Sequence, residues 1–250
     1  MSVTLPPTLV PVSSTTRVIA CATDEIGEVA ADVVSSVAPD GVLGVATGSS
    51  PLALYAALIR RRAEGLRTEG LRLFALDEYV GLQTDDPRSY AAYVRSVIAE
   101  PLGIPVENVR VPHGSTDTDG AAYERLISAA GGVDVQIVGI GRNGHIGFNE
   151  PGSDAETRTR VVALDESTRR ANAEHFDDDL TQVPTHALTQ GVATILSARR
   201  IVLVAAGSAK AAALRAALTG PVTADNPASF LQRHPDVTVV ADHDALREDR

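Results

Sequence analysis

The sequence predicts an α/β protein with an open, mostly parallel β-sheet covered by helices on both faces. Two observations carry this prediction. Short apolar runs rich in Val, Ile and Leu alternate along the chain with longer segments of helical periodicity. Several runs are apolar or nearly so, as in 201–206 and in 135–140, where Gln136 is the one polar residue, and strands that are buried on both faces of a parallel sheet have this pattern.

Seven apolar runs are the expected strands, in chain order Arg17–Ala22, Val42–Ala46, Leu71–Leu76, Val109–Val111, Val133–Ile140, Ile201–Ala206 and Val237–Ala241. The helical segments between them are about 24–38, 51–64, 88–100, 117–130, 184–198 and 208–219. We expect residues 1–16 to be a flexible N-terminal segment, followed by one domain over 17–250.

Composition excludes several classes of protein. The 250 residues include 22 basic and 32 acidic side chains, for a net charge of −10, which disfavours binding to nucleic acid or to an anionic membrane through bulk charge. No apolar stretch approaches the roughly 18 to 20 residues that span a bilayer. The single cysteine, Cys21, excludes an intramolecular disulfide, and the segment 1–16 does not resemble a signal peptide, so we expect a cytoplasmic protein.

Ligands of parallel sheets bind at the carboxyl ends of the strands, so the segments that follow the apolar runs are the candidate site. After the second run comes Thr47-Gly48-Ser49-Ser50-Pro51, which opens an amphipathic helix. Glycine allows close backbone approach, the hydroxyls donate hydrogen bonds, and the helix N-terminus favours an anion. Taken alone, an ordinary helix N-cap explains the same residues.

Two further strand ends carry charged residues. Asp77 and Glu78 follow the third run and could supply a general base, although a solvated turn would look the same. After the sixth run, Gly207 is followed by Lys210 at the start of a helix. A lysine there opposes the helix dipole unless an anion lies between them. Lys210 is the only lysine among the 22 basic residues, which favours a function for it.

The fifth run is followed by the glycine-rich loop 139–152, which contains a formal G-x-G-x-x-G pattern. That pattern binds a dinucleotide only where its last glycine opens a helix, and the glycines and proline that follow forbid one, so we exclude nicotinamide binding. The loop presents Asn143, His145 and Glu150. A histidine with a carboxylate five residues away can form an oriented acid–base pair.

Other chemistries have little support in the sequence. No His, Cys and carboxylate residues stand at a recognisable metal-ligand spacing; the histidines are scattered at His113, His145, His175, His186, His234 and His243. No G-x-S-x-G motif is present, which argues against a serine hydrolase.

Together these loops resemble the glucosamine-6-phosphate deaminase family, within a superfamily that includes 6-phosphogluconolactonase. The resemblance covers nearly the whole chain from about residue 17 and rests on segments 47–51, 76–82, 143–151 and 182–189. The Asp-Glu-Tyr-Val-Gly-Leu and Gly-His-Ile-x-Phe-Asn-Glu-Pro signatures favour the deaminase branch. The resemblance implies a modified Rossmann-like α/β fold, no metal or cofactor, and either a small or a hexameric assembly, which leaves homo-oligomerisation open.

The resemblance also implies roles for these residues. The 47–50 loop and Lys210 would hold the 6-phosphate of a hexosamine phosphate. His145, oriented by Glu150 and Asn143, would open the sugar ring. Asp77 would take the proton from C2 of the open aldehyde and return it to C1. The segment from Arg160 to about Ala187 would be a mobile lid over the site.

Three positions depart from the family pattern. Asn143 stands where many members carry Asp. Val162 stands where some members carry an allosteric lysine, so we do not expect their allosteric activation. Glu174 stands where the family ordinarily has an Arg that clamps the phosphate, and a carboxylate would repel it. Arg169, Arg170 or His175 would have to compensate, unless the lid serves a different substrate or step.

The departure at Glu174 suggests an alternative activity on N-acetylglucosamine 6-phosphate. Ring opening and C2 deprotonation by Asp77 would be unchanged, but the acylated nitrogen leaves poorly, so the C3 hydroxyl would be expelled, with Glu174 protonating it. That reaction is a dehydration, catalysed by a lyase. A 6-phosphogluconolactonase and a non-catalytic sugar-phosphate sensor are the remaining alternatives; a sensor has no need of a C2 base.

Overall fold

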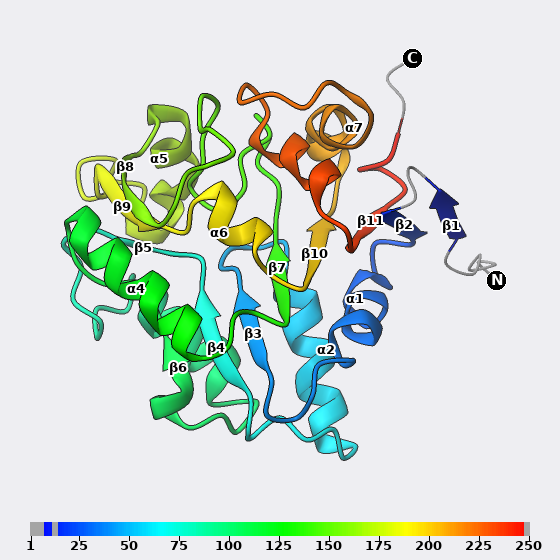
Figure 1. Cartoon of the computed structure of the whole chain (residues 1–250), viewed down its shortest axis with the longest axis horizontal. Helices are drawn as coiled ribbons and strands as arrows, with labels where there is room; N and C mark the ends of the chain where they lie inside the picture. The colour runs from blue at the N-terminus through cyan, green and yellow to red at the C-terminus, as the bar shows by residue number, and fades with distance from the viewer. Residues whose placement is uncertain (1–7, 12–14, 248–250) are drawn as a thin grey trace.

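The structure is a computed structural model that describes residues 8–11 and 15–247. Over these residues it has an eight-stranded sheet in the order β1-β2-β11-β10-β7-β3-β4-β6 and a three-stranded sheet in the order β5-β9-β8 (Figure 1). The strands of the large sheet are β1 (Thr8–Pro11), β2 (Thr16–Cys21), β3 (Val42–Val45), β4 (Arg72–Ala75), β6 (Val109–Arg110), β7 (Val135–Val138), β10 (Arg200–Ala205) and β11 (Val237–Asp242). Those of the small sheet are β5 (Asp77–Tyr79), β8 (Arg160–Ala163) and β9 (His186–Thr189).

Helices connect the strands. The α-helices are α1 (Ile26–Val34), α2 (Leu52–Ala63), α3 (Tyr90–Tyr93), α4 (Asp117–Ala129), α5 (Glu166–Asn172), α6 (Val192–Leu196) and α7 (Ala211–Thr219). A π-helix, η1 (Val94–Ala99), continues α3, and the 3-10 helices are η2 (Val106–Asn108), η3 (Ala173–Phe176), η4 (Ser208–Lys210) and η5 (Pro227–Arg233).

The predicted fold class is confirmed. All seven predicted strands are present, each within two residues of its expected bounds, and they pair in parallel. These runs are deeply buried: every residue of β3, β7 and β11 is buried, including the polar residues Gln136, Thr238 and Asp242. Parallel pairing on both sides and helices on both faces leave these strands no solvent-facing side.

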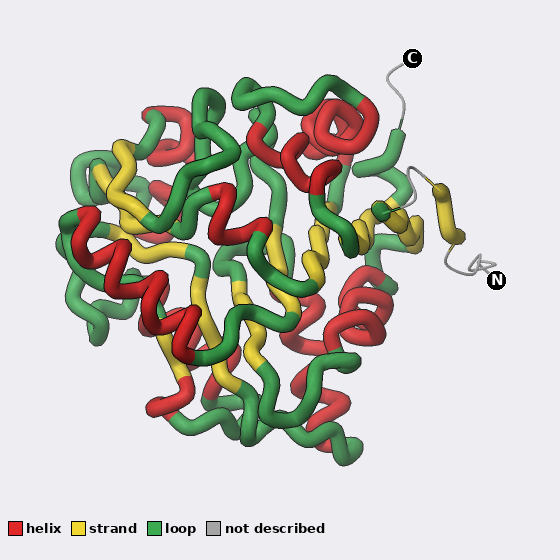
Figure 2. The backbone as a smooth tube through the Cα atoms, in the orientation of Figure 1, coloured by secondary structure: helices red, strands yellow, loops and turns green. Residues whose placement is uncertain are grey.

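The order of the strands places the candidate site. From β3 the chain passes through α2 to β4 in one direction, and from β7 it passes through α6 to β10 in the other. Right-handed crossovers then put α2 and α6 on opposite faces of the sheet, as Figure 1 shows. The carboxyl ends of the adjacent strands β3 and β7 therefore lie at the point where the strand order reverses, which is where open α/β sheets bind ligands. Loops gather along this edge (Figure 2).

Two expectations about local structure need correction. Strand β1 (Thr8–Pro11) pairs antiparallel with β2, so part of the N-terminal segment that we expected to be flexible is ordered; residues 1–7 and 12–14 lie outside the described residues. The helix expected over 184–198 is wrong. Strand β9 occupies its first half because β5 and β8 both pair with it, and only α6 is helical.

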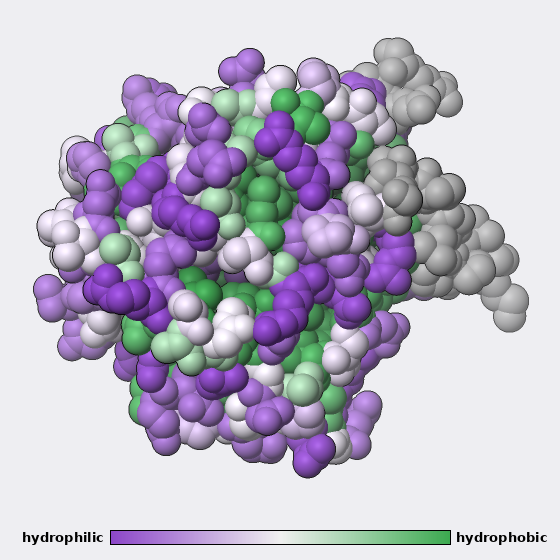
Figure 3. All heavy atoms as spheres, in the orientation of Figure 1, coloured by the Kyte–Doolittle hydropathy of each residue, from purple (hydrophilic) through white to green (hydrophobic). Residues whose placement is uncertain are grey.

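The surface carries few large apolar groups. Of the described residues, the exposed large hydrophobic ones are Leu52, Val106 and Leu126, which are far apart in sequence. Hydrophilic residues dominate the face in Figure 3, and hydrophobic ones show in hollows between them. Over residues 8–11 and 15–247 no helix is long and apolar enough to cross a bilayer.

Candidate active site

Asp77 lies where the chain leaves the large sheet for the small one. Leu76 N–H still donates to Val45 of β3, whereas Asp77 begins β5 and is paired with Thr189 of β9. Its side chain is 5% exposed. Burial, and then the charge of Glu78, raises the pKa of Asp77 to about 8. Asp77 is therefore a carboxyl group that binds and releases a proton near neutral pH, as a general base requires.

The neighbouring Glu78 has a different role. Its carboxylate accepts hydrogen bonds from the backbone N–H groups of Tyr79, Tyr90 and Ala91 at 2.8, 3.0 and 2.8 Å. These contacts join β5 to the start of α3, whose first N–H groups have no partner within the helix. Of the two adjacent carboxylates, Glu78 is therefore used to hold the fold together, whereas no described residue hydrogen-bonds to the Asp77 carboxyl.

The glycine-rich loop after β7 brings Asn143, His145 and Glu150 together. Asn143 Nδ2 donates to Glu150 Oε2 at 2.6 Å, and His145 Nδ1 lies 3.3 Å from the same oxygen. These hydrogen bonds, with the charge of His145, outweigh burial and lower the pKa of Glu150 to about 2. An ionised carboxylate at Nδ1 orients the imidazole and leaves Nε2 to exchange a proton with a ligand.

Two glycines of this loop make room for the reacting groups. A Cβ at Gly141 would collide with the His145 ring. A Cβ at Gly147 would lie 3.4 Å from Asp77 Oδ2 and 3.1 Å from Thr189 Oγ1, and Gly147 has a φ of +55°, a backbone conformation that favours glycine. The loop that carries His145 therefore packs directly against Asp77.

The other predicted residues lie at the same edge of the sheet. The 47–50 loop follows β3, and a Cβ at Gly139, just after β7, would lie 3.5 Å from the Ser50 side chain. Gly48 accepts a hydrogen bond from the Tyr93 hydroxyl at 3.2 Å. Lys210, at the start of α7, follows β10, which is paired with β7. The loops of three adjacent strands thus converge.

A second cation accompanies Lys210. The pKa of Lys210 is lowered, first by burial and then by the charge of Arg142 in the β7 loop. Over residues 8–11 and 15–247 no carboxylate forms an ion pair with either side chain. Two cations without a described carboxylate partner, on the loops that follow β7 and β10, favour an anionic ligand. The sequence reasoning missed Arg142, although its place between Gly141 and Asn143 was available as a signal.

The predicted lid packs against β5 and the loop after β7 through an apolar cluster of its own. Leu164, Ala173 and Phe176 of the lid are buried against Tyr79 of β5 and Phe148 of the 139–152 loop. The Tyr79 and Phe176 rings meet edge to face with centroids 5.6 Å apart. Helix α5 and η3 are therefore held over the site by a small core that is separate from the main one.

Glu174 is not brought to the other candidate residues. Its side chain is 73% exposed, and its partner is the adjacent His175, at 3.7 Å. The cations considered as substitutes for the missing arginine are engaged elsewhere: Arg169 donates to the carbonyls of Leu180 and Val183, and Arg170 pairs with Glu166. The arrangement gives Glu174 no contact through which it could assist a reaction.

Thr168 is a second residue that the sequence reasoning missed. It lies on α5, is 7% exposed, and donates a hydrogen bond to Glu150 Oε1. Nothing in the sequence pairs positions 150 and 168, because the contact depends on how α5 packs.

Within the described part of the chain, no group of three or more His, Cys, Asp or Glu side chains is placed to hold a metal ion.

Comparison with known proteins assigns the chain to a family. The family model described as glucosamine-6-phosphate isomerases/6-phosphogluconolactonase matches residues 13–240. The chain belongs to this family. The resemblance of its loop motifs is thereby confirmed. A protein of Cutibacterium acnes named glucosamine-6-phosphate deaminase is 51% identical over 234 residues, which cover 90% of this chain and 89% of the relative. One of the same name from Bifidobacterium longum is 48% identical over 231 residues, covering 88% and 85%.

Solved structures of the family agree. A monomeric glucosamine-6-phosphate deaminase superposes with a TM-score of 0.88 at 42% identity, covering 92% of this chain and 99% of the other. A 6-phosphogluconolactonase from Leishmania guyanensis superposes with a TM-score of 0.69 at 21% identity, covering 91% and 96%. The second likeness concerns the fold alone, whereas the first extends to sequence.

Proposed function

We propose that this protein converts glucosamine 6-phosphate and water into fructose 6-phosphate and ammonia. The observation that carries the proposal is the approach of two proton-transfer groups: the buried carboxyl of Asp77 lies against the loop that holds the His145–Glu150 pair. Family membership and relatives near 50% identity named for this deaminase support it. Lys210 and Arg142, two cations without a described carboxylate partner, suit the phosphate.

Ring opening comes first. His145 takes the proton from O1 of the pyranose and delivers it to O5 as the C1–O5 bond breaks, which leaves the open aldehyde. Glu150 keeps the imidazole oriented and stabilises its transient positive charge, and Asn143 holds the carboxylate. One group can serve both oxygens because both belong to the same anomeric carbon.

Asp77 then moves the C2 proton. The carboxylate removes it, the electron pair forms the C1–C2 double bond, and the aldehyde oxygen takes a proton that the ammonium group of the substrate releases, which gives an enolamine. The proton held by Asp77 returns to C1, which leaves a protonated imine at C2. Water adds to C2, the protonated amine leaves as ammonia, and the C2 ketone of fructose 6-phosphate remains. The same carboxyl group thus gives back the proton that it took.

The test is to incubate the purified protein separately with glucosamine 6-phosphate and N-acetylglucosamine 6-phosphate. We expect ammonia and fructose 6-phosphate from the first and no product from the second. A dehydrated acetamido sugar from the second would support the lyase alternative, and the absence of turnover with either would overturn the proposal. A lactonase assay on the 6-phosphogluconolactone separates the remaining activity of the family.

Asp77→Asn distinguishes the enzyme from a sensor. If the variant binds inorganic phosphate as the wild type does but no longer turns over substrate, the enzyme interpretation holds.

We also propose a cytoplasmic location, because Cys21, the single cysteine, is a buried free thiol, which is compatible with a reducing compartment.

A further inference from the structure

We propose that Thr168 is a positioning residue: its hydroxyl fixes the Glu150 carboxylate when helix α5 is seated, and so couples the lid to the His145–Glu150 acid–base pair. The inference deepens the proposed function and rests on it, since that pair opens the sugar ring. It concerns a residue that makes no contact with the reacting atoms and acts through Glu150.

The contact comes from one face of the lid helix. Thr168 and Asn172 are four residues apart in α5 (Glu166–Asn172), so they lie on the same side of the helix. Thr168 Oγ1 donates to Glu150 Oε1, and Asn172 Nδ2 donates to the Tyr79 hydroxyl at 2.9 Å. One polar face of α5 therefore meets the glycine-rich loop through Thr168 and strand β5 through Asn172.

The Thr168 contact completes the hydrogen bonding of Glu150. Asn143 and His145 both approach Oε2, and contacts to one oxygen leave the carboxylate free to rotate about the bond to its γ-carbon. Thr168 holds the other oxygen, Oε1, so the plane of the carboxylate is fixed from both ends. The hydrogen bond from Thr168 is also one of those that lower the pKa of Glu150 to about 2.

The hydroxyl has no other structural duty that would explain it. Thr168 is in the first turn of α5, where a threonine side chain often bonds to a backbone group, but over the described residues its hydroxyl bonds only to Glu150. Its 7% exposure excludes water as the main partner. Replacing the hydroxyl by a methyl group keeps the side-chain volume, so the packing of α5 can be retained while the contact is lost.

The seating of α5 determines whether the contact exists. Helix α5 is followed by η3, whose Ala173 and Phe176 lie in the apolar cluster with Tyr79 and Phe148. A movement that lifts this cluster carries Thr168 away from Glu150. Substrate that enters while the lid is raised would then meet a loosely held acid–base pair. Closure of the lid would restore the contact between Thr168 and Glu150, so the pair would be positioned for catalysis only once the substrate is enclosed.

The experiment compares Thr168→Val, which removes the hydroxyl, with Thr168→Ser, which keeps it. The matched control is Thr181→Val: Thr181 is another lid threonine whose hydroxyl donates to a carboxylate, that of Asp179 at 2.6 Å, away from the site. We expect Thr168→Val to lower kcat about tenfold to hundredfold, with the KM and the inhibition constant of inorganic phosphate changed by less than about threefold. Thr168→Ser and Thr181→Val should keep the wild-type kcat.

A double-mutant cycle with Glu150→Gln shows whether Thr168 acts through Glu150. If it does, Thr168→Val causes no further loss of kcat in the Glu150→Gln background, because the group that it positions is already altered. An equal loss in both backgrounds, or a wild-type kcat in Thr168→Val, overturns the inference. If Thr168→Val unfolds, Thr168→Ala is used in the same cycle.

A spectroscopic readout separates failure of the inference from failure of the proposed function. The ring ¹⁵N signals of His145, compared at one pH, should move in Thr168→Val and stay in place in Thr168→Ser and Thr181→Val. This measurement needs no turnover. A wild type that releases no ammonia contradicts the proposed function alone, whereas unmoved signals in Thr168→Val contradict the positioning role alone.

Discussion

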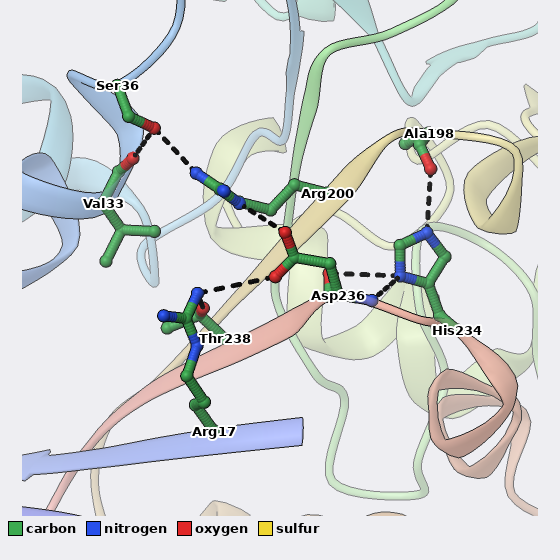
Figure 4. Close-up of polar contacts among 8 residues, drawn as sticks. All are labelled: Arg17, Val33, Ser36, Ala198, Arg200, His234, Asp236 and Thr238. Carbon is green, nitrogen blue, oxygen red and sulfur yellow. Dashed lines mark hydrogen bonds and ion pairs between the residues drawn. The ribbon is translucent and has the colours of Figure 1, made fainter. Parts of the chain in front are cut away.

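Charged side chains at the two edges of the large sheet differ in their partners. At the amino edge, where the parallel strands begin, Asp236 precedes β11 and is held between two arginines: Arg200 Nε at 2.9 Å and Arg17 Nη2 at 3.5 Å (Figure 4). At the carboxyl edge, no described side chain hydrogen-bonds to the Asp77 carboxyl, and Lys210 pairs with no described carboxylate. The charges of Asp236 and its two arginines therefore satisfy one another, whereas Asp77 and Lys210 have no described side-chain partner of this kind.

Two histidines show the same difference. His234, at the amino edge, is 3% exposed; its Nε2 lies 2.8 Å from the Ala198 carbonyl, and its Nδ1 accepts from Asp236 N–H at 3.1 Å (Figure 4). Both ring nitrogens are thus used within the fold. His145 has one nitrogen at Glu150 and the other unused by any described residue. The two rings therefore differ in hydrogen-bonding capacity: His234 has both nitrogens occupied, and His145 keeps one nitrogen available for a ligand.

The largest effect that tests this comparison is expected for Asp77→Asn. Removing the C2 base should lower kcat about 10³-fold or more, while inorganic phosphate, which does not need Asp77, continues to inhibit. Steady-state kinetics with glucosamine 6-phosphate measure both quantities. Turnover within tenfold of the wild type would show that another group takes the proton.

The pH dependence follows from the same carboxyl group. Because the pKa of Asp77 is about 8, kcat/KM should rise about fiftyfold from pH 6 to pH 8 as the base ionises. Stability should move in the opposite direction: the folded-state pKa lies above the unfolded value, so the stabilising contribution is complete below the unfolded pKa and is lost as pH rises through about 8. Tm measured at both pH values should fall for the wild type, and fall less for Asp77→Asn.

The cations of the carboxyl edge are expected to act on binding. Lys210→Met should raise KM and the inhibition constant of inorganic phosphate about tenfold to hundredfold, because it removes a charged hydrogen bond to the anion, and Arg142→Gln should do the same to a smaller extent. Arg200→Met, at the amino edge, is the matched control and should leave both constants unchanged. An unchanged inhibition constant in Lys210→Met would place the phosphate elsewhere.

Asp236→Asn tests the amino edge. The substitution weakens contacts to two arginines, and because all three side chains are partly exposed, we expect a loss of about 1 kcal/mol in the free energy of unfolding with kcat unchanged. Urea denaturation and the ammonia assay measure the two. A large fall in kcat at wild-type stability would contradict the separation of the two edges.

The sequence predicted the parts of the molecule that depend on burial alone. An apolar run such as Ile201–Ala206 is stable only where both of its faces are buried, so its strand could be predicted. The loops after such strands, which carry Asp77, His145 and Lys210, could then be placed at one edge of the sheet. The small sheet could not be predicted, because β5, β8 and β9 have three or four residues each and mix polar with apolar side chains. Their strand conformation comes from pairing with one another, which overrides local helical periodicity in 184–198.

The sequence predicted which loops carry the candidate residues, but not the contacts that depend on packing. Asp77 and the residues 143–150 could be singled out because they follow strands of a parallel sheet, whose carboxyl ends bind ligands. Thr168 carries no such signal, since its partner Glu150 is 18 positions away and the contact depends on where α5 lies. The expectation for Glu174 rested on a family position, and family position does not determine where an exposed side chain on a short helix points.

Glu174→Arg should have the smallest effect, and it is the sharpest test of how the lid lies. Glu174 and His175 are both more than half exposed, and an exposed ion pair contributes little, so restoring the arginine of the family should change kcat and KM by less than about threefold. A tenfold fall in KM would contradict this placement, because it would mean that η3 turns position 174 toward the phosphate when substrate is bound. The added charge alone is not a sufficient explanation for such a fall, and Glu174→Lys separates the two effects: a lysine at the same position carries the charge without the paired donors of a guanidinium. A gain specific to arginine would therefore report direct contact with the phosphate, and equal gains would report only a more positive lid.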